Sequence, residues 1–258
     1  MDGFDWGAWD HYGFAAVALV GTFAASAALI AYMNDPRHGA RLRVFAGVAP
    51  PFINIIGVLF GLTLAFLAND TWSAHDRATG AITREADSLQ AVVSLTRALP
   101  AGDRERLDRA VATYATSAVE VEWPLLARRR AGPGTAAHLD RLLAVVAAPE
   151  IAVALGTSVH AEVLRQIIDV RVSRDQRVAL SQTHVNPLKW LGMAFLGFVT
   201  MLSVAVVHVE NTRAALAAIL LFAAAAAPTA AIVLIQGNPF QQPTTVTAAP
   251  IAALAARR

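Results

Sequence analysis

The sequence has no cysteine among its 258 residues, which excludes disulfides, thiol catalysis and zinc sites built on cysteine. Charge is also scarce, since Asp, Glu, Lys and Arg make up 16% of the chain, against about 25% in soluble proteins. The net charge of +2 is too small to indicate nucleic-acid binding, whereas hydrophobic residues reach 56%. These proportions argue against an ordinary soluble enzyme and favour a membrane protein.

The charges that are present are concentrated in one central segment. Residues 70–186 hold 14 arginines and 14 acidic residues, whereas the other 141 residues hold only 12 charges. Four long apolar segments lie outside it, at residues 12–33, 47–68, 188–209 and 214–236. Each approaches or exceeds the roughly 20 residues that a helix needs to cross a bilayer core. We therefore predict an all-α integral membrane protein with four transmembrane helices and a helical soluble domain inserted between the second and third.

The predicted organisation has four parts. Residues 1–69 hold the N-terminal tail and transmembrane helices 1 and 2, and residues 70–186 form the helical polar domain. Residues 187–236 hold transmembrane helices 3 and 4, and residues 237–258 form the C-terminal tail. The segment before the first apolar stretch carries three Asp and no Lys or Arg, which is the opposite of a secretory signal. We therefore expect the first helix to stay uncleaved.

Helix patterns extend through the polar segment, and strand patterns are absent. Residues 70–99 contain one glycine and no proline, so the second transmembrane helix is expected to continue as one rod out of the membrane. Asp103 is the expected N-cap of the next helix, which has a predicted turn or bend at Trp123-Pro124. Further helices are predicted over residues 136–147 and 149–186.

Side chains suited to catalysis are sparse and poorly spaced. His75 with Asp76, and His160 with Glu162, come nearest to a metal or acid–base pair, but no H-E-x-x-H spacing occurs. A phosphate-binding glycine loop, a G-x-S-x-G elbow and a dinucleotide-binding pattern are all missing from the sequence. We predict no enzymatic activity, no cofactor and no metal site.

Two charged groups in the polar segment are interpreted as surface features. Glu85 and Asp87 are expected to pair with Arg84 on the outside of a helix. The run Arg128-Arg129-Arg130 lies near a predicted helix end, where basic residues complement the helix dipole and face water or anionic lipid.

The second transmembrane helix carries two patterns of its own. Gly57, Gly61 and Ala65 recur every fourth residue and predict a face for close helix packing. Large apolar residues recur at three- and four-residue spacing on another face, at Ile55, Leu59, Leu62 and Phe66. If several copies surround an axis, this ridge becomes an apolar neck that gates by dewetting. The alternative is that both faces pack against other helices and lipid.

Polar residues mark the same helix. Asn54 lies within the apolar segment and is a candidate pore-lining residue. Asn69 and Asp70 follow the segment at the predicted pore mouth. Polar groups at such positions need protein partners or water, and this requirement favours a functional role.

Several short motifs resemble the bestrophin-like family of bacterial membrane proteins. They are L-A-F-L-A-N-D-T-W at 64–72, D-R-A-T-G-A-I-T-R-E-A-D-S-L at 76–89, Glu122-Trp123-Pro124, D-V-R-V-S-R-D-Q-R at 169–177, V-N-P-L-K-W at 185–190 and Asn238-Pro239-Phe240. The resemblance covers most of the chain in consistent order. The sequence departs from the tail pattern of the family at two places. An acidic residue is common in the family where this chain has Gly237 or Asn238, and a glycine is common where it has Gln241.

The resemblance, through the more distant bestrophins, implies a pentameric anion channel with a cytoplasmic helical domain. By this analogy Ile55, Leu59, Leu62 and Phe66 form the neck, and Asn54 lies in the pore-lining helix. The partners implied are other copies of the chain, the lipid bilayer and small inorganic ions. Calcium control is not carried over, because no acidic cluster has calcium-ligand spacing.

Sidedness is open from the charges alone. The domain and both termini must share one side, and Arg37, Arg41, Arg43 and Arg213 in the short loops favour cytoplasmic loops. Basic residues flanking the domain side, and the resemblance, favour instead a cytoplasmic domain at a bacterial inner membrane.

The predicted function is a passive homo-oligomeric ion channel. The main alternative is a non-conducting membrane sensor or scaffold whose helical domain binds a protein partner. A transporter would call for inverted repeats or charged residues at the membrane midplane, and the sequence has neither.

Overall fold

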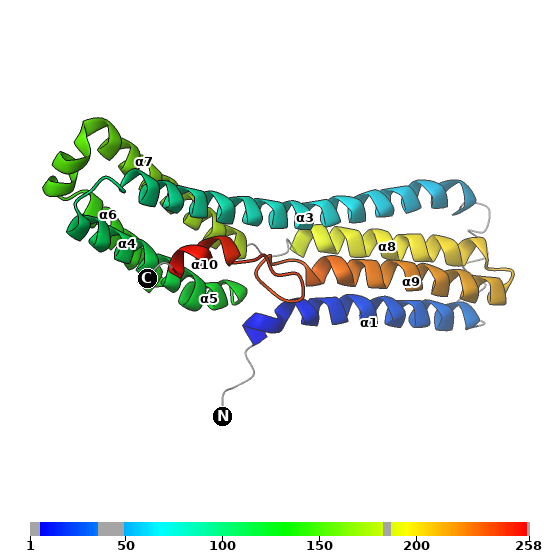
Figure 1. Ribbon diagram of the computed structural model, residues 1–258. Coiled ribbons are helices and arrows are strands. Elements are labelled where there is room, and N and C mark those ends of the chain that lie inside the picture. The colour runs from blue at the N-terminus through cyan, green and yellow to red at the C-terminus, as the bar shows by residue number, and fades with distance from the viewer. Residues whose placement is uncertain (1–5, 36–48, 183–186, 257–258) are drawn as a thin grey trace, which may run out of the picture. The chain divides into compact units, whose positions relative to one another are not determined.

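The computed structural model describes residues 6–35, 49–182 and 187–256, and every regular element in these ranges is a helix (Figure 1). In chain order they are α1 (Trp6–Asn34), α3 (Ala49–Leu95), α4 (Ala101–Thr116), the π-helix η1 (Ser117–Glu122), α5 (Trp123–Ala127), α6 (Pro133–Val146), α7 (Pro149–Ser181), α8 (Pro187–Val207), α9 (Thr212–Ile235) and α10 (Ala249–Ala255). The prediction of an all-helical chain is confirmed over the described residues.

Five of these helices are long and apolar enough to cross a membrane. Four of them, α1, α3, α8 and α9, contain the four predicted apolar segments or nearly all of them. The fifth candidate is α7, which the sequence analysis places in the polar domain. The loop arginines Arg37, Arg41 and Arg43 lie outside the described residues, as do His184, Val185 and Asn186.

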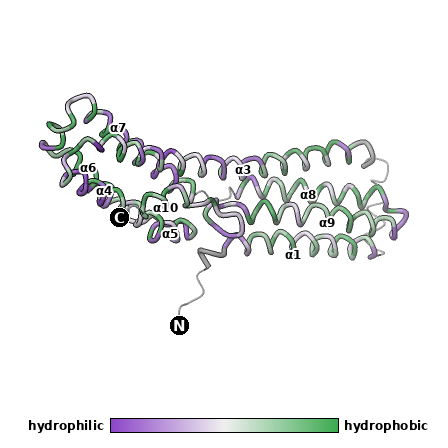
Figure 2. The backbone as a smooth tube through the Cα atoms, in the orientation of Figure 1, coloured by the Kyte–Doolittle hydropathy of each residue, from purple (hydrophilic) through white to green (hydrophobic). Residues whose placement is uncertain are grey.

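The chain divides into two compact units. Unit 1 comprises Met1–Trp72 and His184–Gly237, and unit 2 comprises Ser73–Thr183 and Asn238–Arg258. The helices of unit 1 are hydrophobic along most of their length, whereas polar residues are more frequent in unit 2 (Figure 2). Helix α3 contributes its first half to unit 1 and its second half to unit 2.

Small side chains allow the helices of unit 1 to pack closely. Helix α1 packs on α8 and α9, and α9 buries alanines against its neighbours. On α8, Gly197 faces the Phe60 ring of α3, which would lie 3.1 Å from a Cβ atom at that position. Glycine therefore permits this approach of α3 to α8. In the same unit, Leu67 and Ala68 of α3 bury against Met193.

Helix α3 continues beyond Trp72 without a break, as the sequence predicts. It has 47 residues. The segment after Trp72 has no proline, and its only glycine, Gly80, does not interrupt the helix.

Unit 2 is built around one apolar core. Leu89 and Val92 of α3 pack there with Leu107 of α4 and Ile167 of α7, all nearly inaccessible to solvent. The C-terminal segment also joins this core, since Phe240, Ile251 and Leu254 are buried in it. Residues Asn238–Arg258 are thus part of unit 2.

Two local expectations in the polar segment are wrong. Helix α4 begins at Ala101 after Pro100 and has no side-chain cap, while Asp103 lies in the first turn 3.7 Å from Arg106. A carboxylate in the first turn is still stabilised by the positive end of the helix dipole. Trp123-Pro124 does not form a turn, because π-helix η1 runs directly into α5 and Pro124 occupies the first turn of α5.

Gly156 introduces an unexpected break inside α7. Its φ of 74° and ψ of 160° lie in a region that side-chain-bearing residues avoid. No atom lies within 4 Å of a Cβ built at this position, so backbone conformation alone requires glycine.

We expect Gly156→Ala to lower the free energy of unfolding by about 1–3 kcal/mol, because alanine is strained in this conformation. Thermal unfolding of the detergent-solubilised protein would measure the loss. Gly102→Ala is the matched control, since Gly102 lies in α4 with open space around its Cβ position. Equal melting temperatures for the two variants would contradict the assigned strain.

Candidate functional site

The predicted neck residues form one exposed ridge on α3. Ile55, Leu59, Leu62 and Phe66 are 58%, 47%, 50% and 62% exposed in the single chain. The other side of the helix supplies the packing contacts, through Phe60, Leu64 and Leu67. Four large apolar side chains in a row are thus left for lipid or for other copies of the chain.

The predicted packing residues of α3 lie in open surroundings. Gly61 and Ala65 are exposed and Gly57 is half-buried, and no atom lies within 4 Å of a Cβ built at either glycine. Within the described chain, these residues make no close helix contact of the kind that Gly197 makes. Asn54 is exposed on the same helix. Close packing at these small residues remains a prediction for a neighbouring subunit.

Polar contacts surround the predicted pore mouth. Lys189 of α8 donates a hydrogen bond from Nζ to Oδ2 of Asp70 at 2.7 Å. Two residues further along α3, the Trp72 indole Nε1 donates to Oε1 of Gln236 at 3.0 Å. Asn69 is exposed. The ion pair of Lys189 with Asp70 joins α8 to α3.

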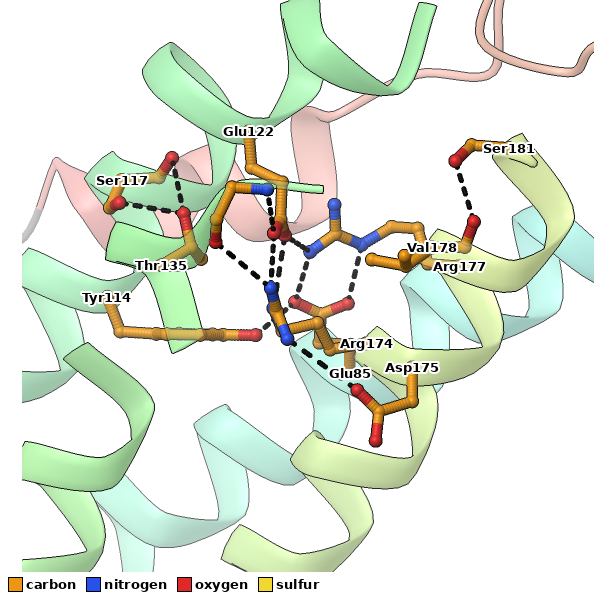
Figure 3. A network of polar contacts seen from close by, with 11 residues as sticks. Glu85, Tyr114, Ser117, Glu122, Thr135, Arg174, Asp175, Arg177, Val178 and Ser181 are labelled. Carbon is orange, nitrogen blue, oxygen red and sulfur yellow. Dashed lines mark hydrogen bonds and ion pairs between the residues drawn. The ribbon is translucent and has the colours of Figure 1, made fainter. Parts of the chain in front are cut away.

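A second candidate site is a network of buried charges in unit 2 (Figure 3). At its centre is Arg177 of α7, which is fully buried. Its Nε donates to Oε2 of Glu85 at 2.9 Å, and its Nη2 donates to Oε1 of Glu85 at 3.1 Å and to Oε2 of Glu122 at 3.0 Å. Helices α3, η1 and α7 are thereby joined by a single guanidinium group.

Glu122 is held by further donors. Arg174, one turn before Arg177, donates to both carboxylate oxygens of Glu122 and to the carbonyl oxygen of Gly132. The amide of Gly132 donates to Oε1 of Glu122 at 3.2 Å. Two buried carboxylates therefore face two buried arginines, which balances the charge of the network.

Aromatic side chains enclose the same arginine. The Arg177 guanidinium lies 5.5 Å from the ring centroid of Trp123, within range of a cation–π interaction. Trp123 meets Phe240 edge to face at 5.3 Å. Asn238 and Gln241 donate side-chain hydrogen bonds to the carbonyl oxygens of Leu126 and Ala127. The C-terminal segment is thus fastened beside the network.

The Tyr114 hydroxyl completes the surroundings of Glu85. It donates to Oε1 of Glu85 at 2.7 Å, and the tyrosine is fully buried. Burial raises the pKa of the Tyr114 phenol well above its usual value, and the adjacent Glu85 carboxylate raises it further. Tyr114 therefore remains a neutral donor to Glu85.

The expected surface pairing of Glu85 is wrong. Glu85 is fully buried, whereas Arg84 is exposed and donates to Oε1 of Gln176 at 2.7 Å. One signal in the sequence could have revealed this, because Glu85 falls between Ile82 and Leu89 on the apolar stripe of the helix. A carboxylate on such a stripe must find a buried partner.

The network and its aromatic neighbours unite four of the six segments on which the family resemblance depends. Glu85 lies in 76–89, and Arg174 and Arg177 lie in 169–177. The other two of these four are Glu122-Trp123-Pro124 and Asn238-Pro239-Phe240. Segments far apart in the sequence thus meet at one buried site. Among the described residues, no three His, Asp or Glu side chains are grouped to hold a metal ion.

We expect Arg177→Met to lower the free energy of unfolding by about 3–5 kcal/mol, because it leaves two buried carboxylates without their main partner. Thermal unfolding in detergent would measure the effect. Arg171→Met is the matched control on the same helix, since Arg171 pairs with Asp140 at the surface. A similar small loss in both variants would contradict the central role of Arg177.

Tyr114→Phe tests the hydrogen bond to Glu85 through pH. At neutral pH we expect a loss of about 1.5–3 kcal/mol, because a donor to a buried charge is removed. Above about pH 10 the unfolded tyrosine loses its proton while the folded one keeps it, so the native protein loses stability that the variant does not. The difference in melting temperature should therefore narrow at alkaline pH. A constant difference would contradict the raised pKa.

Comparisons with known proteins concern the family and the fold of the chain. The family model of the Bestrophin-like domain matches residues 19–251. No curated protein matches the chain. A bacterial bestrophin homolog from Klebsiella pneumoniae, solved as a crystal structure of a variant, is 14% identical with a TM-score of 0.65, covering 94% of this chain and 97% of that chain.

Two further crystal structures of membrane protein variants are similar. One is 14% identical with a TM-score of 0.67, covering 94% of this chain and 96% of that chain. The other is 15% identical with a TM-score of 0.61, covering 93% of this chain and 94% of that chain. At these identities the likeness concerns the fold. Together with the family match, which confirms the resemblance in the sequence motifs, it establishes that this chain belongs to the Bestrophin-like domain family of membrane proteins.

Proposed function

We propose that the protein is a homo-oligomeric, passive ion channel whose pore is lined by the first half of α3. The observation that carries the proposal is the row of four large, half-exposed apolar side chains at Ile55, Leu59, Leu62 and Phe66. The ridge spans 12 helical residues, from Ile55 to Phe66, with a rise of about 16 Å. Arranged around an axis, it forms an apolar neck that closes to ions by dewetting.

The proposed topology has four transmembrane helices: α1, the first half of α3, α8 and α9. All four belong to unit 1. Helix α7 is assigned to the polar domain for two reasons. Gly156 breaks it near its start, and Arg174 and Arg177 carry the buried charge network within unit 2. The domain is then an insertion between the second and third transmembrane helices.

The proposed subunit contacts involve the small residues of α3. Gly57, Gly61 and Ala65 leave space beside the ridge in the single chain, and a neighbouring helix can approach closely there. A ring of copies would place each ridge toward the axis and each small-residue face toward the next subunit. By analogy with bestrophins the ring is a pentamer in the bacterial inner membrane, with the helical domain in the cytoplasm and a preference for anions.

A route for gating follows from the continuity of α3. Glu85, which is held by Arg177 and Tyr114, lies 19 residues after Phe66 on the same helix. Any rearrangement of the network that moves this end of α3 is transmitted along a hydrogen-bonded rod. The buried network of unit 2 is thus the proposed point at which a signal reaches the neck.

The second candidate function is a non-conducting sensor or scaffold. Apolar side chains exposed on α7 favour it, since Val153, Ile168 and Val172 are 83%, 56% and 60% exposed. Such residues on the polar domain suit a protein partner. Size-exclusion chromatography with light scattering separates the two functions, because a pore requires a stable ring and a scaffold does not.

Planar bilayers containing the purified protein under a KCl gradient test the channel. Discrete currents would support it, and the sign of the reversal potential would identify the preferred ion. Silence over a wide range of voltage, pH and calcium concentration would favour the scaffold.

We expect Phe66→Ala and Leu62→Ala to raise the open probability several-fold, because a wider and less apolar neck is easier to wet. Single-channel recording measures this directly. Phe195→Ala is the matched control, since Phe195 of α8 is 65% exposed and lies outside the ridge. Unchanged open probability in both neck variants would overturn the assignment of the ridge as the gate.

A further inference from the structure

The ion pair between Asp70 and Lys189 lies where the apolar ridge of α3 ends. Asp70 follows Phe66 by four residues, so it continues the ridge along the same face of the helix. Lys189, near the start of α8, reaches across to it with an Nζ–Oδ2 distance of 2.7 Å. Both side chains remain more than half exposed, at 57% for Asp70 and 56% for Lys189.

Asp70 is the sole ionisable residue of α3 within unit 1, as the sequence of residues 49–72 shows. A ring of copies would therefore bring one carboxylate per subunit to the end of the neck. Such a ring of Asp side chains attracts cations and repels anions. Lys189 places an opposite charge in contact with each carboxylate and cancels this preference.

We propose that Lys189 is a selectivity-determining residue, which prevents the pore from selecting cations by neutralising Asp70 at its mouth. This inference rests on the proposed function, because it requires that α3 lines a pore. The ligand class is the small monovalent ion. A charge at the pore mouth acts on a passing ion because salt screens charges only beyond about 8–10 Å. An ion that passes the mouth comes closer than this to the Asp70 carboxylate.

Because the pair is exposed, its role in ion selectivity can be tested separately from its role in stability. An exposed ion pair contributes little to stability, so either partner can be replaced without unfolding the protein. Four substitutions form the set: Lys189→Gln, Asp70→Asn, the double substitution, and Lys189→Arg, which retains the charge. Size-exclusion chromatography checks that each variant elutes as the unmodified protein does.

The readout is the reversal potential in planar bilayers under a KCl gradient, converted to the permeability ratio of potassium to chloride. Lys189→Gln should raise this ratio by about fivefold or more, the effect of one uncompensated charge a few ångströms from the ion in water. Asp70→Asn should lower it by a similar factor. The double substitution and Lys189→Arg should both give the ratio of the unmodified protein.

The possible failures are distinguishable. Clear currents with the same reversal potential in Lys189→Gln, Asp70→Asn and the unmodified protein would overturn the role of Lys189 while leaving the channel intact. A permeability ratio that changes in Lys189→Gln but not in Asp70→Asn would also overturn the role of Lys189, because neutralisation requires both partners. Absence of current from every protein would overturn the channel, and the inference with it.

Discussion

The buried guanidinium of Arg177 is the interaction on which the structure of unit 2 depends. Two carboxylates, from Glu85 and Glu122, lie in an interior that excludes water, and each would be strongly unfavourable there without a counter-charge. Arg177 contacts both, and Arg174 adds a second positive charge at Glu122. The three helices that supply these residues, α3, η1 and α7, can therefore adopt only arrangements that keep the charges together.

This constraint explains local features that are otherwise puzzling. One of these features is η1, because π-helices are rare and this one ends at Glu122. The wider turn of a π-helix changes the direction in which its side chains point, here that of the Glu122 carboxylate. Trp123 comes directly after it and lies against Arg177, and Phe240 covers it from the C-terminal segment. The geometry of η1 is thus tied to the placement of one carboxylate and one indole beside the same arginine.

The sequence predicts the structure well where local information is sufficient. The absence of proline after Trp72 predicted the unbroken α3, because helix continuity depends on neighbouring residues. The prediction failed at Glu85, because the partner Arg177 lies 92 residues away and a charged residue on a helix is usually at the surface. It also failed at Gly156, since an isolated glycine is compatible with either a helix or a break, and tertiary packing decides between them.

The ridge of α3 raises a different problem, since lipid and a dewetted neck both favour large apolar side chains. Apolarity alone therefore does not distinguish a lipid-facing surface from a pore-facing one. The ion pair at the end of the ridge separates the two assignments by what it can do. Asp70 meets a lysine from α8 in an exposed pair where α3 leaves its apolar segment. Charges that border a pore act on the ions that pass it, whereas charges at a lipid interface meet only headgroups and water. The two assignments of this face of α3 therefore differ in whether Asp70 and Lys189 influence the passage of ions.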